Sequence, residues 1–262
     1  MIYPIRSIQS HMQTLILKHF RFTRYGRYMK KIHNSHLGES CFIIGNGPSL
    51  TAEDLTTILE NHIDSFAVNR IFKIFPQTDW RPTYYVNTDH VLIRDIQDEI
   101  NQLPIKDKFT PLQNKYYHKI RIKNAHYFFR DDIVGRFSLD CTDKVAIRGT
   151  VTIACIQLAA HMGYKNIYLL GVDHNFDRII TESGEVIIDP SVNNYFCEGY
   201  DDDIANEVVH NMGKTTKSYM DVQQFYSQHG VNIFNATRKT KLKVFPLISF
   251  EDAVKDVING KQ

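Results

Sequence analysis

An apolar run that stops at a glycine-rich turn constrains the fold of this chain more than any other feature. Residues 41–44 are all apolar, and they are followed at once by Gly45, Asn46, Gly47, Pro48 and Ser49. A short apolar run bounded by glycine is typical of a buried parallel strand. The glycines let a ligand approach the backbone, and Asn46 offers both a donor and an acceptor. We expect Ser49 to cap a following helix, whose amide groups would attract an anion.

Apolar strands alternate with helices along the rest of the chain, which predicts a doubly wound parallel α/β sheet. The expected strands are 40–44, 65–69, 83–89, 125–129, 166–173 and 231–235, and the expected helices are 51–62, 150–162 and 217–229. A further helix is expected in the charged region between residues 89 and 125. Ligands of such folds bind outside the carboxyl ends of the strands. Four strand ends carry polar residues, namely Asn46, Asn69, Asp89 and Asp173.

We expect the chain to divide into a basic amphipathic extension, residues 1–38, and an α/β domain, residues 39–262. Seven Lys and Arg residues precede the first acidic residue, Glu39, and they are interspersed with apolar side chains. Residues 1–31 therefore suit an anionic membrane surface, and the alternative is a helical extension packed on the domain or on another subunit. The polar, weakly periodic stretch at about 175–216 is expected to be a lid.

Composition excludes several classes of protein. The net charge of +2 among 262 residues does not indicate nucleic-acid binding. The four cysteines lack CxxC spacing, and no apolar run is long enough to span a membrane, so we expect a cytoplasmic protein, peripheral on the inner face of the membrane. Metal-binding His-Glu-x-x-His, P-loop and standard dinucleotide signatures are absent from the sequence.

Four motifs in this order resemble the bacterial sialyltransferases of glycosyltransferase family 42. They also resemble a related Rossmann-like group that contains archaeal 6-hydroxymethylpterin diphosphokinases and uncharacterised surface-glycan proteins. The motifs are Ile43-Ile-Gly-Asn-Gly-Pro-Ser-Leu50, Val68-Asn-Arg70, Arg148-Gly-Thr-Val151 and Met162-Gly-Tyr-Lys-Asn-Ile-Tyr-Leu-Leu-Gly-Val-Asp173. The resemblance implies a single GT-A-like, Rossmann-like domain that binds a nucleotide-sugar donor.

The resemblance also implies roles for individual residues. Asn46 and Asn69 would contact the CMP part of the donor, and the Arg148-Gly149-Thr150 segment would contact the donor before the long helix. Asp173, followed by His174, would lie beside the nucleotide, and a lid histidine, here His210, would be the general base. The family's phosphate-binding tyrosines are missing after Asp173, and Tyr195 and Tyr200 are the candidates to replace them. For Asn46, Asn69, Asp173, His174 and His210 the alternative is a structural one: a turn, a helix cap, a loop hydrogen bond or a solvated surface group.

The sequence thus predicts an inverting glycosyltransferase that takes an acidic, sialic-acid-like or Kdo-like sugar from a CMP-activated donor. The acceptor would be a bacterial surface glycan or its lipid-linked precursor, and no metal would be needed. One alternative is a diphosphotransferase that uses ATP and Mg²⁺, with Asp89 and Asp173 holding the metal. Another is a non-catalytic nucleotide-binding scaffold. The donor sugar, the acceptor, the linkage and the presence of a homo-oligomer stay open.

Overall fold

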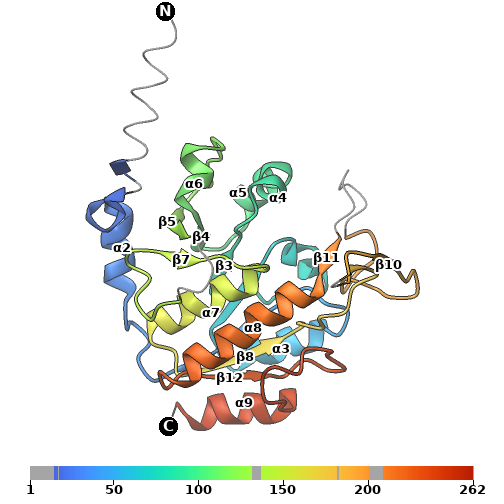
Figure 1. The fold of residues 1–262 in the computed structure, drawn as a ribbon. Coiled ribbons are helices and arrows are strands. Elements are labelled where there is room, and N and C mark those ends of the chain that lie inside the picture. Colours follow the sequence, from blue (N-terminus) through green and yellow to red (C-terminus); the bar gives the residue numbers. More distant parts are fainter. Residues whose placement is uncertain (1–14, 17, 132–136, 182, 201–208, 262) are drawn as a thin grey trace, which may run out of the picture.

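A seven-stranded parallel sheet forms the centre of the computed structural model, which describes residues 15–16, 18–131, 137–181, 183–200 and 209–261 (Figure 1). Its strand order is β12-β8-β1-β2-β3-β4-β5. The bounds are β1 Ser40–Ile44, β2 Ser65–Val68, β3 Tyr84–Val86, β4 Asp107–Pro111, β5 Ala125–Phe128, β8 Asn166–Leu170 and β12 Asn232–Asn235. Every neighbouring pair is parallel, which confirms the predicted doubly wound sheet.

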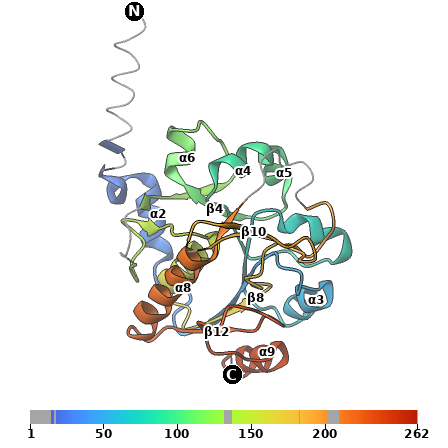
Figure 2. The same cartoon turned by 45° about the vertical axis from the view of Figure 1, so that its right-hand side comes forward.

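Helices cover both faces of the sheet, because successive strand residues point to opposite sides (Figures 1 and 2). In β1, Cys41 and Ile43 join the core beneath α2, α7 and α8, whereas Phe42 and Ile44 join the core beneath α3, α4, α5 and α9. The helix bounds are α2 Arg24–Ile32, α3 Ala52–Glu60, α4 His90–Asp95, α5 Gln97–Gln102, α6 Leu112–Tyr116, α7 Val151–Met162, α8 Met212–Ser227 and α9 Phe250–Asn259. Shorter elements are the 3-10 helices η1 Phe20–Phe22 and η2 Ile71–Gln77, and strands β6 Arg130–Asp131 and β7 Val145–Ala146.

Strand β4 is a difference from the sequence prediction, which expected a helix in this region. Its sequence, Asp-Lys-Phe-Thr-Pro, contains one strongly apolar residue, Phe109, and therefore carries little signal for a buried strand. Pairing with β3 and β5 nevertheless buries the strand, including Lys108. Two helices, α4 and α5, precede it, so the helix expected between residues 89 and 125 is present, whereas the strand at 107–111 was not predicted.

The described part of the N-terminal extension packs on the domain. Phe20 and Met29 are buried, and the Met29 carbonyl is 2.8 Å from Nε2 of the buried His161 on α7. Residues 1–14 of the expected membrane-binding segment lie outside the described residues. Within the described ranges, no helix has both the length and the apolar character needed to cross a membrane.

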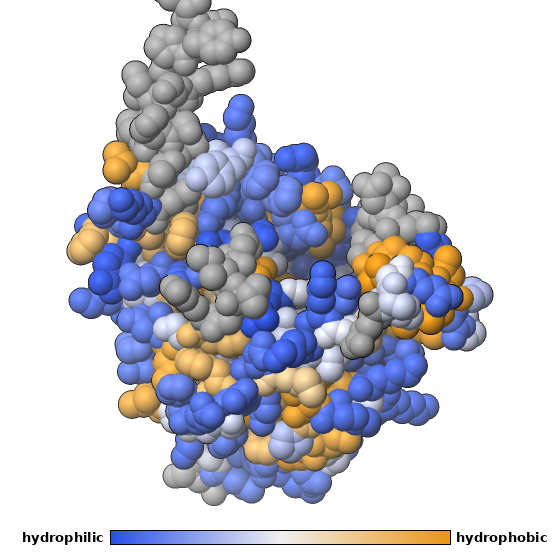
Figure 3. Space-filling view, viewed as in Figure 1, coloured by the Kyte–Doolittle hydropathy of each residue, from blue (hydrophilic) through white to orange (hydrophobic). Residues whose placement is uncertain are grey.

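The segment expected to be a loop-like lid carries a small three-stranded sheet. Strands β9 Arg178–Ile180, β10 Val186–Ile188 and β11 His210–Asn211 pair in the order β10-β9-β11. All three side chains of β10 are exposed, and Figure 3 shows the apolar area in this part of the molecule. The strands have only two or three residues each, too few to give a strand signal in the sequence.

Candidate functional site

The carboxyl ends of β1 and β8 define the candidate site. From β1 the sheet grows in one direction through β2 to β5, and in the other through β8 and β12. The crevice at this reversal of strand order is where ligands bind in open α/β sheets. The turn that the sequence singles out, residues 45–49, follows β1 and lies at this crevice together with residues 171–174, which follow β8.

Close backbone contacts join the turns after β1 and β8. Gly45 N donates to the Leu170 carbonyl at 2.7 Å, and Gly47 N donates to the Gly171 carbonyl at 2.8 Å. A Cβ atom on Gly45 would lie 2.3 Å from the Gly171 oxygen, and one on Gly47 would lie 1.9 Å from Asp173 Oδ2. The two glycines are therefore required by the packing of these turns, a reason that the sequence analysis did not find.

Ser49 does not cap the following helix, and this part of the prediction was wrong. Its hydroxyl donates to Asp173 Oδ2 at 2.8 Å, and Thr51 caps α3 in a capping box with Asp54. Arg238 pairs with Asp54 through both carboxylate oxygens, at 2.6 and 2.8 Å. The first turn of α3 thus has its own carboxylate, which argues against a phosphate at this helix start.

Asn46 has a buried side-chain oxygen, Oδ1, that no described residue satisfies. The side chain is 9% exposed, and its Nδ2 donates to the Val68 carbonyl of β2 at 3.1 Å, while Oδ1 has no hydrogen-bond partner among the described residues. A buried polar atom without a partner is destabilising by about 1–3 kcal/mol. Such an atom at the crevice is suited to accept a hydrogen bond from a ligand. The neighbouring Pro48 is exposed.

The other two polar strand ends differ from each other. Asn69 follows β2 in the left-handed region, with φ of 52°, and its carbonyl accepts a hydrogen bond from the Tyr85 hydroxyl at 2.7 Å. Asp89 is exposed and caps α4 by accepting a hydrogen bond from Val91 N at 2.8 Å. The structural alternative therefore accounts for Asp89. The sequence analysis passed over the buried Asn87 in the same Val-Asn-Thr-Asp run, although its amide lies closer to the end of β3.

The segment before α7 lies at the same edge of the sheet. Thr150 caps this twelve-residue helix by accepting a hydrogen bond from Thr152 N at 3.3 Å, and the first turn of α7 holds no acidic residue. Gly149 has a φ of +73°, and a Cβ atom there would touch Thr215 of α8. Arg148 pairs with Asp221 of α8 at 3.0 Å, so its guanidinium already has a carboxylate partner.

Two histidines come together from the turn after β8 and from β11. His174 is 7% exposed, and its Nε2 lies 2.8 Å from the Thr216 hydroxyl of α8. His210 stacks on Phe176, with 3.7 Å between the ring centroids. Burial lowers the pKa of His210, although the Asp177 carboxylate opposes this shift. Burial, with a smaller contribution from His210, lowers the pKa of His174 to about 4. Both rings are therefore neutral at pH 7, as a general base must be.

Asp173 is buried against the turn after β1, and burial raises its pKa although hydrogen bonds from Ser49 oppose the shift. The Ser49 hydroxyl holds one carboxylate oxygen of Asp173, and the Asp173 backbone carbonyl accepts a hydrogen bond from Lys241 N at 2.8 Å. Asp173 thus fixes the relative position of three segments at the crevice. Phe176 and Thr216 are site residues that the sequence analysis missed, since an isolated Phe or Thr in a polar segment gives no signal.

The lowered pKa of His174 predicts how the stability of the protein depends on pH. Its pKa is about 4 in the folded chain and near 6.5 when unfolded, so the unfolded chain binds more protons between these values. Stability from this residue is therefore present above pH 6.5 and is lost as the pH falls, by about 2 kcal/mol between pH 7 and 5. We expect His174→Asn, which tolerates the left-handed backbone at this position, to reduce that loss. Urea unfolding at pH 7 and pH 5 measures the free energy of unfolding of the parent and the variant. If the difference between the two pH values is the same in both proteins, the lowered pKa of His174 is contradicted.

Part of the expected lid lies across the crevice. Phe196 N donates to the Asn46 carbonyl at 3.1 Å, and the Tyr200 hydroxyl accepts a hydrogen bond from Arg70 N at 3.1 Å. Tyr200 also stacks on Tyr195, with ring centroids 3.9 Å apart. Residues around 195–200 thus cover the ends of β1 and β2, and the Tyr200 hydroxyl already has a protein partner.

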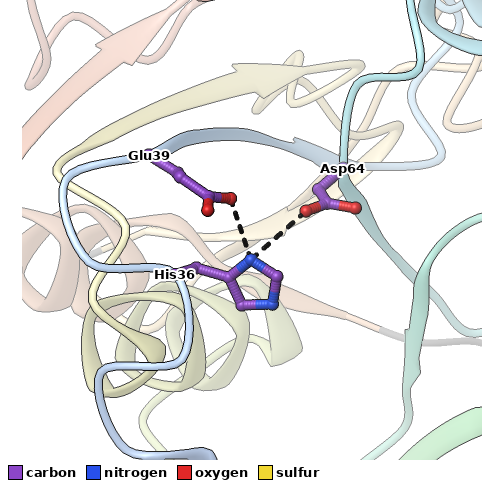
Figure 4. A group of neighbouring side chains, drawn as sticks. All are labelled: His36, Glu39 and Asp64. Atoms are coloured by element: carbon purple, nitrogen blue, oxygen red, sulfur yellow. Dashed lines mark hydrogen bonds and ion pairs between the residues drawn. The ribbon is translucent and has the colours of Figure 1, made fainter. Parts of the chain in front are cut away.

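A group of side chains of the types that bind metals, His36, Glu39 and Asp64, lies at the amino ends of β1 and β2, opposite the crevice (Figure 4). His36 Nδ1 is 2.9 Å from Glu39 Oε2 and 3.5 Å from Asp64 Oδ2, while His36 Nε2 is 2.8 Å from the Tyr84 hydroxyl. Tyr164 donates to Asp64 at 2.7 Å. Because side chains engage both ring nitrogens, this cluster is accounted for as a link between residues 36–39 and the sheet. It is the only such group found among the described residues.

The parallel sheet and its reversal of strand order define the class of this protein as a doubly wound α/β protein with a crevice at the strand ends. Residues 15–178 match the sequence model of the family described as 6-hydroxymethylpterin diphosphokinase MptE-like, and the chain belongs to this family. The matched range includes β1 to β8 and the turns that meet at the crevice.

Two solved structures are similar to this chain. The MAf glycosyltransferase from Magnetospirillum magneticum AMB-1 has a TM-score of 0.51 and 13% identity over 87% of this chain, which spans only 38% of that protein. The sialyltransferase CstII from Campylobacter jejuni, solved with the substrate analogue cytidine-5'-monophosphate, has a TM-score of 0.48 and 14% identity over 81% of this chain and 86% of that one. No curated protein matches the sequence. The match to the family model confirms the predicted resemblance to the group that contains the 6-hydroxymethylpterin diphosphokinases.

Proposed function

We propose that the protein is an inverting glycosyltransferase that takes an acidic sugar from a CMP-activated donor. The observation that carries the proposal is the buried, unpartnered Oδ1 of Asn46 at the crevice between β1 and β8. Cytosine has an exocyclic amino group, and ribose has hydroxyl groups, so either part of CMP supplies the missing donor. Asn69, at the end of the adjacent strand, would hold the other part of the nucleoside.

The donor phosphate would lie at the start of α7. Thr150 and the first-turn amides of this helix face no acidic side chain of their own helix, unlike those of α3. A helix start of this kind stabilises the charge that develops on the leaving CMP. This placement replaces the α3 start that the sequence indicated.

His210 would act as the general base. The neutral ring takes the proton of the acceptor hydroxyl while the acceptor oxygen bonds to the anomeric carbon from one face. The bond from that carbon to the CMP oxygen breaks on the opposite face, and this single displacement inverts the configuration. The acceptor would be a surface glycan or a lipid-linked precursor, which the basic N-terminal segment would bring to the inner face of the membrane.

A nucleotide panel tests the proposal. We expect CMP and CDP to raise the melting temperature in the presence of EDTA, because a ligand that binds only the folded state stabilises it by about 2.7 kcal/mol at 100 times its Kd. For a chain of this size the shift is roughly 5–10 °C. UDP, GDP, ADP and ATP are each measured in the same buffer for comparison, with EDTA or with Mg²⁺.

The variant Asn46→Ala should lose this shift while the unliganded protein stays folded. Asn259→Ala is the matched control, because Asn259 is exposed at the end of α9. A CMP shift that survives in Asn46→Ala would place the nucleotide elsewhere. Nucleotide binding without release of CMP from a CMP-activated sugar would instead support the non-catalytic scaffold.

The family description favours a second candidate, a diphosphotransferase that uses ATP and Mg²⁺. Its predicted metal pair, Asp89 and Asp173, follows strands β3 and β8, which are separated by β1 and β2. Three strand spacings amount to ~14 Å, too far for one ion, and Asp89 is engaged as a helix cap. Stabilisation by ATP or ADP only when Mg²⁺ is present would favour this candidate over sugar transfer.

A further inference from the structure

A pocket of about 440 Å³ lies against the outer edge of the sheet, away from the strand-end crevice. Its walls come from α2, from α6 and from residues 121–127 around β5. Strand β5 is four strand spacings from β1, or ~19 Å. The pocket is therefore a separate site, and its volume is within the range of small-molecule pockets.

Three cations line this pocket, namely Arg24, Lys115 and Arg121, and none of the described residues that line it is acidic. None of the three forms an ion pair with a described residue. Asp107, the carboxylate behind one wall, is held at 2.7 Å by His126 Nε2 and at 3.3 Å by the Tyr28 hydroxyl. The positive charge in the pocket thus lacks a carboxylate counter-ion.

A phenol takes the place of that counter-ion. Arg24 Nη2 and Lys115 Nζ both donate to the Tyr25 hydroxyl, at 2.9 and 2.6 Å. Burial raises the pKa of Tyr25, but the hydrogen bonds from Lys115 and Arg24 outweigh it and leave the pKa lowered. Arg24 and Lys115 are therefore both oriented toward the Tyr25 hydroxyl, which is a neutral acceptor and not a carboxylate.

Aromatic rings hold the cations in position. The Lys115 ammonium lies 5.1 Å from the ring centroid of Tyr25 and 5.0 Å from that of Tyr127. Tyr28 and His126 stack at 3.7 Å on the wall of the same pocket. Contacts with ring faces keep charged groups in place without neutralising them. The pocket thus offers converging charge and flat apolar walls.

We infer that this pocket binds a phosphate-bearing ligand. A phosphate group carries more than one negative charge and several acceptor oxygens, which matches an arginine fork beside a lysine. Helix α2, which forms one wall of the pocket, also carries Arg27, Lys30 and Lys31 and no acidic residue. The phosphate belongs either to a soluble phosphorylated molecule or to a lipid headgroup, and the experiment separates these two sources.

Two probes of the full chain test the inference. Calorimetric titration with inorganic pyrophosphate, at ionic strength held constant with NaCl, reports a soluble phosphate ligand. Co-sedimentation with phosphatidylglycerol vesicles, compared with phosphatidylcholine vesicles, reports a headgroup. We expect Lys115→Gln and Arg121→Gln to weaken at least one of the two by about ten- to a hundred-fold, the loss of one charge-assisted contact.

Arg121→Gln keeps the test valid if Lys115→Gln disturbs folding, because the exposed Arg121 side chain has no hydrogen bond to a described residue. Lys165→Gln is the control, since Lys165 is exposed at the start of β8.

Loss in the vesicle assay alone assigns a lipid headgroup, and loss in the titration assigns a soluble ligand. If both pocket variants bind both probes as Lys165→Gln does, the inference is wrong. Asn46→Ala should leave either interaction intact, which separates this pocket from the crevice.

Discussion

Replacement of His210 by Gln should lower the release of CMP from a CMP-activated sialic acid by about 10²- to 10⁴-fold, the contribution typical of a general base. The affinity for CMP should stay within two- to three-fold of the parent, because in the proposed mechanism the ring acts on the proton of the acceptor and not on the nucleotide. Since burial lowers the pKa of His210, the parent rate should fall at pH values below 6.5 as the ring becomes protonated. That acid limb should be missing in the variant. Steady-state rates from pH 5 to 8 measure both effects.

A matched histidine variant gives the control for this experiment. His229 follows the opposite end of α8 and is exposed, and its Nδ1 is near the Phe225 carbonyl. His229→Gln should therefore keep the parent rate and the parent pH profile. A His210→Gln enzyme that retains more than a tenth of the parent rate would remove His210 from the mechanism and leave His174 as the neutral histidine to test.

Replacement of Gly45 by Ala should lower the melting temperature by roughly 6–12 °C. The new methyl group would lie 2.3 Å from the Gly171 oxygen, which belongs to the backbone of an adjacent buried turn and cannot rotate away. Overpacking of this kind is destabilising by about 3 kcal/mol, and a chain of this size loses roughly 2–4 °C per kcal/mol. Thermal unfolding followed by circular dichroism measures the change.

Gly260→Ala is the control for the effect of an added methyl group. Gly260 ends α9 with a φ of −72°, and its nearest new contact would be at 3.3 Å. Its melting temperature should stay within about 2 °C of the parent value, as for ordinary surface substitutions. If Gly45→Ala is as stable as Gly260→Ala, the turns after β1 and β8 do not pack as described.

Local patterns in the sequence were sufficient for most of the fold. The apolar runs of β1, β2 and β8 and the apolar helix α7 lie where the pattern places them, because a buried parallel strand and a buried helix each need a continuous set of apolar residues. Strand β4 was missed because it lacks such a set of apolar residues. Its burial comes from pairing with β3 and β5 and not from its own composition. The polar strand ends at Asn46 and Asp173 could likewise be assigned to one edge of the sheet from sequence.

Contacts between distant segments decided what those residues do. Ser49 bonds to Asp173 and not to its own helix, Arg238 pairs with Asp54 at the start of α3, and the strand order places Asp89 three strand spacings from Asp173. The unpartnered oxygen of Asn46 and the uncompensated cations beside β5 are likewise visible only once the strands are in order. The sequence by itself determined the burial of the apolar segments, because that burial follows from the apolar pattern of each segment, whereas the polar strand β4 is buried by its neighbours. Only the tertiary structure decided which polar groups meet and which stay without a partner, because hydrogen bonds and ion pairs join residues far apart in the chain, 124 positions apart for Ser49 and Asp173.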